Sequence, residues 1–260
     1  MKADLSSRKT QWRIQDSQGF DLKKVVIVAL LIITVACSVG QASAATQFTQ
    51  STKRAVFLSP LERWMSTWDL NGYVSQLERA GYQVDTLLDG NVSIAFLRTK
   101  LVDYDLIILR TDAFVEETFG PFYCSGETIN ATMAKTFADE ISSREIKIGA
   151  CLGFSPAFLQ HSYPMDSLRD SLVYVIASNS NYLSSVFLTA GASAFIGYDQ
   201  DFTLSWGRID ALSTKLLMYL AEGFSVKNAI IQLFIYLHTG HGRDTDWLTP
   251  TWSGDGDYKI

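Results

Sequence analysis

This 260-residue chain is poor in three residue types that often carry chemistry or structure: it has three cysteines, three histidines and five prolines. Charged residues make up only 19% of the sequence, and the net charge is −5. A chain with this charge balance lacks the basic surface that nucleic-acid binding requires, so we expect no nucleic-acid partner. The sequence also contains no internal repeat and no low-complexity tract. Because 47% of the residues are hydrophobic and 12% are aromatic, disorder is excluded for most of the length.

An uncharged apolar run occupies residues 25–39 and follows Lys23 and Lys24. The run is shorter than the ~20 residues that cross a bilayer, but extending it to Ala45 approaches that length. Residues 42–44, Ala-Ser-Ala, have the small-x-small form that signal peptidases read. A cleaved signal peptide and an uncleaved signal-anchor helix over residues 25–44 therefore both remain open. In either case the preceding basic residues place a polar tail, residues 1–24, in the cytoplasm. The rest is expected to be secreted or membrane-anchored outside it.

A linker over residues 45–53 precedes a region, residues 54–260, in which apolar runs alternate with helical stretches. We predict one α/β domain there, a three-layer sandwich with a mostly parallel central sheet, preceded by the one N-terminal hydrophobic helix. The segment 113–170 is less regular, and the tail 239–260 is expected to wrap the surface. The predicted strands are 55–58, 82–88, 105–110, 147–151, 172–177 and 193–197; the predicted helices are 71–80, 134–141, 183–190, 208–221 and 226–237.

Ligand sites of parallel sheets lie beyond the carboxyl ends of the strands. This rule selects the residues that follow three predicted core strands: Thr111 and Asp112, then Ser178, Asn179 and Ser180, then Asp199 and Asp201. The carboxylates Asp112, Asp199 and Asp201 would suit a basic peptide side chain or a divalent cation bound through oxygens. Separately solvated loop carboxylates are the alternative.

The two cysteines outside the apolar run are Cys124 and Cys151. In an oxidising compartment they could form a disulfide, but two separate buried thiols fit the sequence as well.

Several segments carry a family resemblance. Residues 172–180 read LVYVIASNS, residues 187–192 read FLTAGA, residues 194–197 read AFIG, residues 223–226 read GFSV, and DLIILRT lies upstream at 105–111. Over about residues 102–230 the chain resembles the caspase-like cysteine peptidases, the clan that contains caspases, gingipains and legumains. In that family a catalytic His follows one core strand and the nucleophilic Cys follows the next. The resemblance implies a caspase-like sandwich.

The resemblance breaks at the two catalytic positions, because Asp112 stands where the family has His and Ser178 stands where it has Cys. A carboxylate with a reference pKa of about 3.9 is poorly suited to activate a serine hydroxyl near neutral pH. Loss of either member of such a pair lowers the rate by orders of magnitude. The resemblance therefore implies a catalytically inactive homologue that binds or scaffolds a protein or peptide partner, with no cofactor. Two alternatives remain: an active peptidase that uses Ser178 or another nucleophile, and a carboxylate-lined domain that binds a divalent cation.

Overall fold

The computed structural model describes residues 53–64, 70–201, 206–241 and 249–260. The predicted cytoplasmic tail, the segment 25–44 and nearly all of the linker lie outside the described residues. Within the described ranges, no helix is both long and apolar enough to cross a membrane.

Six strands form the central sheet in the order β10-β9-β8-β3-β1-β2. Five of them run parallel, and β10 pairs antiparallel with β9 at one edge. The structure thus confirms a mostly parallel sheet in which the strands predicted at 105–110, 172–177 and 193–197 are neighbours. The strand bounds are β1 Arg54–Ser59, β2 Gln83–Leu88, β3 Leu106–Arg110, β8 Leu172–Ile176, β9 Ala194–Gly197 and β10 Thr251–Gly254.

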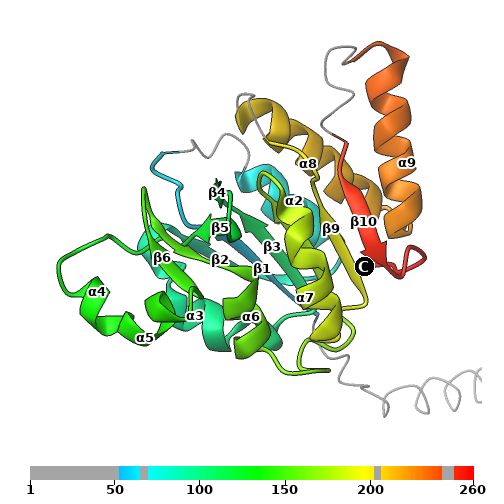
Figure 1. The fold of residues 1–260 in the computed structure, drawn as a ribbon. Coiled ribbons are helices and arrows are strands. Elements are labelled where there is room, and N and C mark those ends of the chain that lie inside the picture. The colour runs from blue at the N-terminus through cyan, green and yellow to red at the C-terminus, as the bar shows by residue number, and fades with distance from the viewer. Residues whose placement is uncertain (1–52, 65–69, 202–205, 242–248) are drawn as a thin grey trace, which may run out of the picture. The chain divides into compact units, whose positions relative to one another are not determined.

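Side chains alternate along each central strand between two cores, as the pleat of a strand requires. Val56 and Leu58 of β1 point into one core, whereas Ala55 and Phe57 point into the other. The first core packs under α3 (Ile94–Thr99), α6 (Pro156–Ser162) and α7 (Ser184–Thr189). The second packs under α2 (Leu70–Arg79), α8 (Trp206–Ala221) and α9 (Val226–Tyr236). Helices therefore cover both faces of the sheet, which gives the predicted three layers (Figure 1).

The segment predicted to be irregular, 113–170, contains a second, antiparallel sheet of order β4-β5-β7-β6. Its strands are β4 Ala113–Glu116, β5 Gly120–Cys124, β6 Ile146–Ile148 and β7 Leu152–Phe154. The single strand predicted at 147–151 is wrong, because a hairpin turn interrupts that stretch and joins β6 to β7. The predicted helix at 134–141 is split into α4 (Met133–Thr136) and α5 (Ala138–Ser142).

The tail was predicted to wrap the surface, but part of it is a sheet strand. β10 pairs Trp252 with Ile196 and Gly254 with Ala194. The short sequence of this strand shows no alternation long enough to reveal it.

Candidate functional site

The carboxyl ends of β3 and β8 meet at one edge of the central sheet. The register pairs Arg110 with Ile176, and the Thr111 amide continues the pairing by donating to the Ile176 carbonyl at 3.0 Å. Asp112 and Ser178 each follow two residues beyond these paired ends. The two positions singled out by the family resemblance are therefore equivalent positions on neighbouring strands.

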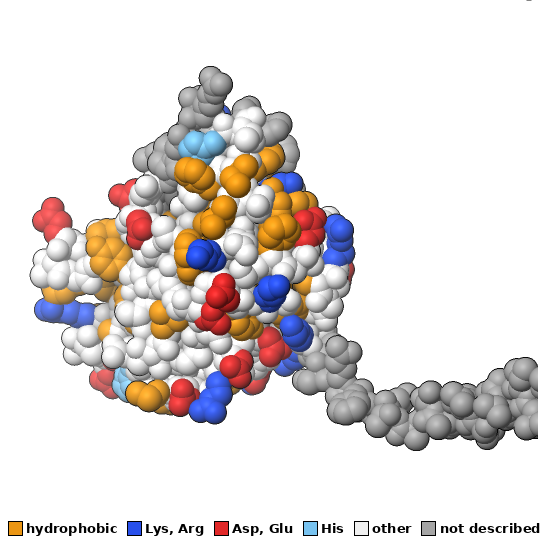
Figure 2. All heavy atoms as spheres, turned by 90° about the vertical axis from the view of Figure 1, so that its right-hand side faces the viewer, with side chains coloured by type: hydrophobic (Ala, Val, Ile, Leu, Met, Phe, Trp, Pro, Cys, Tyr) orange, Lys and Arg blue, Asp and Glu red, His pale blue; other side chains and the backbone are white. Residues whose placement is uncertain are grey.

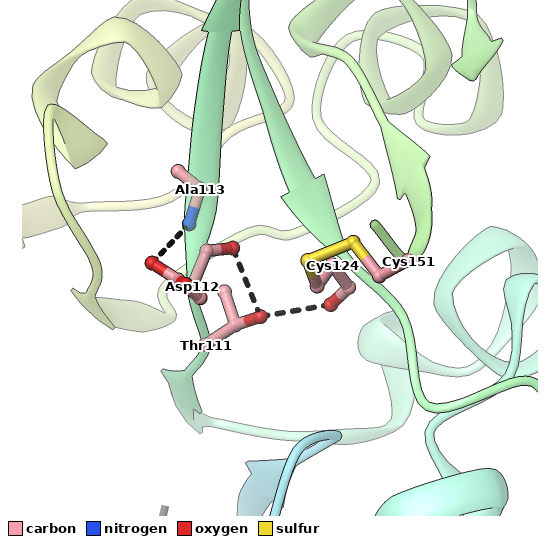
Figure 3. Close-up of a disulfide and its surroundings, with 5 residues drawn as sticks. All are labelled: Thr111, Asp112, Ala113, Cys124 and Cys151. Atoms are coloured by element: carbon pink, nitrogen blue, oxygen red, sulfur yellow. Dashed lines mark hydrogen bonds between the residues drawn. A yellow bond between two sulfur atoms is a disulfide. The ribbon is translucent and has the colours of Figure 1, made fainter. Parts of the chain in front are cut away.

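Asp112 is exposed, and its carboxylate is held by its own loop. Its Oδ1 accepts a hydrogen bond from the Ala113 amide at 2.9 Å, and its carbonyl accepts one from the Cys124 amide at 3.0 Å. The hydroxyl of Thr111, a buried residue, donates to the Cys124 carbonyl at 2.8 Å (Figure 3). These bonds fix the Asp112 loop against the end of β5.

Cys124 and Cys151 are joined by a disulfide that links β5 to the loop before β7, with a Cα–Cα distance of 5.6 Å (Figure 3). Both residues are buried. A thiolate is the reactive form of cysteine, and a disulfide supplies none. Neither cysteine of the described residues is therefore available as a nucleophile in this state.

The turn after β8 is shaped by Asn179, whose φ of 54° lies in the left-handed region that asparagine tolerates better than most residues. The Asn179 carbonyl accepts a hydrogen bond from the Tyr123 hydroxyl at 2.8 Å, and its amide side chain bonds to Asp201. Ser178, which precedes it, is 7% exposed. The turn is thus tied both to β5 and to the loop after β9.

Ser180 has a structural role in this turn. It is fully buried; its hydroxyl donates to the Val175 carbonyl at 2.9 Å and accepts from the Tyr198 amide at 2.9 Å. The hydroxyl thus donates to one backbone group and accepts from another. Ser180, predicted as a pocket residue, therefore positions the turn instead of facing a ligand.

A shallow pocket of about 310 Å³ opens beside the turn and is lined by Asn179, Asn181, Tyr182 and Asp199. Asn181 donates to Asp199 at 2.5 Å and also bonds to Thr251 of β10. Gly197 faces this side chain, because a Cβ at position 197 would lie 2.8 Å from Asn181 Oδ1. The prediction included Asn179 and Asp199 but missed Asn181 and Tyr182, although both follow directly in the same turn.

The three-carboxylate cation site proposed from Asp112, Asp199 and Asp201 does not form. Among the residues that the structure describes, no three His, Cys, Asp or Glu side chains gather closely enough to hold a metal ion. Asp112 bonds to the Ala113 amide, whereas Asp199 and Asp201 bond to Asn181 and Asn179. Each carboxylate thus has its own local donor.

The two histidines whose side chains the structure describes contact groups outside this edge. His161 lies on α6, where its Nδ1 is 3.1 Å from Glu145 Oε1. The pair lines a larger hollow of about 650 Å³ that Arg98 and Glu140 also line, and these two form an ion pair at 2.6 Å. The His238 ring lies 3.8 Å from the Phe234 ring, centroid to centroid, at the end of α9.

A buried ionic cluster, which the sequence pattern did not reveal, lies on the α8 side of the same edge. Arg110, the last residue of β3, donates Nε and Nη2 hydrogen bonds to the two carboxylate oxygens of Asp210 at 2.7 and 2.8 Å. Glu62 Oε2 lies 3.7 Å from Arg110 Nη1. The Tyr73 hydroxyl donates to Asp210 at 3.1 Å, and burial, followed by the Asp210 charge, raises the pKa of Tyr73 well above its usual value. The cluster joins α2 and α8 to the sheet.

No protein-family model matches the chain, and no curated protein matches its sequence. Among solved structures, the Drosophila initiator caspase Dronc matches with a TM-score of 0.38 and 8% sequence identity, over 80% of this chain and 79% of that chain. This superposition is too loose to transfer any residue role or activity.

Proposed function

We propose that this chain is a catalytically inactive caspase-like homologue that binds a peptide or protein segment at the carboxyl edge of its sheet. The observation that carries the proposal is the pair of strand-end positions. Asp112 and Ser178 occupy equivalent places on β3 and β8, where a peptidase of that family needs an imidazole and a thiol. The remaining cysteines of the described residues are bonded to each other, which supports an inactive site.

The surface of the pocket suits binding better than catalysis. Its lining supplies two amides, one carboxylate and the exposed ring of Tyr182, which is 62% accessible. Amides and carboxylates of this kind recognise polar and cationic side chains, and an exposed tyrosine adds apolar contact area with a polar tip. The ligand class that fits is an extended segment with a polar or basic side chain. The proposal also retains export, with residues 25–44 as a signal peptide or an anchor, so that binding occurs outside the cytoplasm.

A peptide library incubated with the purified protein near neutral pH tests both parts of the proposal, the lack of peptidase activity and the binding of a peptide. We expect no cleavage by mass spectrometry, and we expect retention of a subset of peptides that is lost in Tyr182→Ala. The matched control is Met165→Ala, which removes a side chain that is 76% exposed and does not line the pocket. Truncating an exposed side chain of this kind changes stability by about 0.5 kcal/mol or less, so both variants should fold.

Two results would contradict the proposal. Robust cleavage that disappears in Ser178→Ala would show a serine enzyme. Peptide retention that is unchanged in Tyr182→Ala, or that falls equally in Tyr182→Ala and Met165→Ala, would show that binding does not use this pocket.

A further inference from the structure

Helix α9 is apolar on two faces. Val226, Ala229, Ile230 and Leu233 are buried in the core beside α8. On the opposite side Ile231, Phe234 and Ile235 are 40%, 46% and 45% exposed. We call these three residues the α9 patch. Figure 2 shows hydrophobic side chains gathered on the face of the molecule that carries α9.

The patch is unusual for a surface helix, whose outward face normally carries charged side chains. After Lys227, the sequence has no Lys, Arg, Asp or Glu until Arg243. An exposed apolar patch of this kind marks a contact with another protein or with a membrane. Among the described residues, no helix or strand covers Ile231, Phe234 or Ile235 enough to bury them.

We propose that the α9 patch rests on a lipid bilayer surface; this inference depends on the proposed membrane anchor at residues 25–44. A basic side chain on the same side of the helix fits such a surface. Lys227 is exposed on the first turn of α9, one turn before Ile231. Amphipathic helices at membranes combine apolar residues at the acyl boundary with lysines at the level of the lipid phosphates.

The position at which the N-terminal segment joins the domain supports a lipid bilayer as the surface that covers the α9 patch. Arg54, at the start of β1, donates its amide hydrogen to Asp105 at 2.7 Å, just before β3. The first amide of α9, that of Val226, donates to the Tyr258 carbonyl at 3.0 Å, and the Tyr258 hydroxyl donates to the Asp170 carbonyl at 2.7 Å, just before β8. Chain entry and the start of α9 therefore lie at the same, amino end of the sheet.

The length of the linker limits how far an anchored domain can move from a bilayer. Residues 45–52 span at most ~28 Å when fully extended. A domain tethered in this way meets the bilayer at a high effective concentration. A weak apolar contact is sufficient under these conditions.

The test uses the full-length chain reconstituted into phosphatidylcholine vesicles that carry a photoreactive diazirine on an acyl chain. After irradiation, mass spectrometry should find lipid adducts on peptides that contain residues 231–238. We expect the double variant Phe234→Gln, Ile235→Gln to reduce these adducts by about tenfold, because most of the apolar area is removed. Val115→Gln is the matched control, since Val115 is 54% exposed on β4, and it should leave the α9 adducts unchanged.

Adducts at residues 25–39 report the anchor independently of the patch. If those adducts are present but residues 231–238 carry none, the anchor stands and the patch proposal is overturned. If neither region is labelled, both the anchor and the patch proposal fail. A molecular mass of a dimer in detergent that falls to that of a monomer in the double variant would assign the patch to a second copy of the chain, which also overturns the lipid contact.

Discussion

At the scale of single residues, the pair Arg110–Asp210 connects the sheet to α8. Both side chains are almost fully buried, with 2% and 3% of their surface exposed. The guanidinium bonds through two parallel hydrogen bonds, a geometry that arginine favours with carboxylates. Removing one charge would leave the other buried and unpaired, which is far less favourable than losing an exposed pair.

Asp210→Asn should therefore lower the free energy of unfolding by about 3 kcal/mol, as measured by urea denaturation. Asp85→Asn is the control: Asp85 pairs with Arg54 at 2.6 Å, but more than a third of each side chain is exposed, and the change should be below about 1 kcal/mol. Equal losses in the two variants would show that burial of Arg110 does not matter.

Some residues of the candidate site could be predicted from the neighbouring sequence, and others could not. Asp112, Ser178, Asn179 and Asp199 could be predicted because each follows an apolar strand directly. The Arg110–Asp210 pair could not, because it joins residues 100 positions apart. No pattern within one element indicates such a contact.

At the scale of elements, the sequence predicted the parallel strands and the long helices well but not the insertion between β3 and β8. Long apolar runs such as 106–109 carry a clear signal, whereas antiparallel strands of three to five residues do not. Within the insertion α6 begins at Pro156, because proline is suited to the first helical position. Ser155 caps this helix, and its hydroxyl accepts from the Phe158 amide.

We expect the insertion to depend on its disulfide, because β5 and β7 pair through only two residue pairs, Tyr123 with Phe154 and Cys124 with Gly153. The cysteines are 27 positions apart. Closing a loop of this length stabilises a folded chain by about 3.5 kcal/mol. The double variant Cys124→Ala, Cys151→Ala should lose about this much in urea denaturation.

The same variant should show faster hydrogen exchange at the backbone amides of positions 124 and 125, which in the unmodified chain bond to the Asp112 and Leu152 carbonyls. Exchange at the β8 amides should be less affected, since they belong to the central sheet. Unchanged stability together with unchanged exchange would mean that the short ladder holds the insertion without the disulfide.

At the scale of the whole molecule, the second core contains a polar network that sets a limit on stability at high pH. The Tyr174 hydroxyl lies 2.9 Å from that of Tyr198 and 2.8 Å from Ser213 Oγ. Burial raises the pKa of Tyr73, Tyr174 and Tyr198. Tyrosines in the unfolded chain ionise near pH 10, so there the unfolded state releases protons that the folded state keeps.

The contribution of these tyrosines to the free energy of unfolding is therefore fully present below about pH 10 and is lost as the pH rises toward their raised folded-state pKa. Each of these tyrosines should contribute a decrease of about 1.4 kcal/mol per pH unit in that window. Urea denaturation between pH 8 and pH 11 measures the slope, and Tyr174→Phe should make it shallower by one such contribution. A slope unaffected by that substitution would refute the assignment.

The order of the central strands has a consequence for how the chain assembles. β2 adds to β1 on one side, and then β3, β8, β9 and β10 are placed outward in sequence order on the other. A chain that emerges from a ribosome or a translocation channel with its N-terminus first therefore presents every new strand to a neighbour that is already in place. Two outer edges wait longest for a partner. That of β3 stays open until the residues between Arg110 and Leu172 have emerged and β8 can pair with it, and that of β9 stays open until the residues between Gly197 and Thr251 have emerged and β10 can pair with it. Open strand edges recruit other chains, so these two intervals are when nascent copies are most prone to aggregate and when a holding chaperone would be most useful.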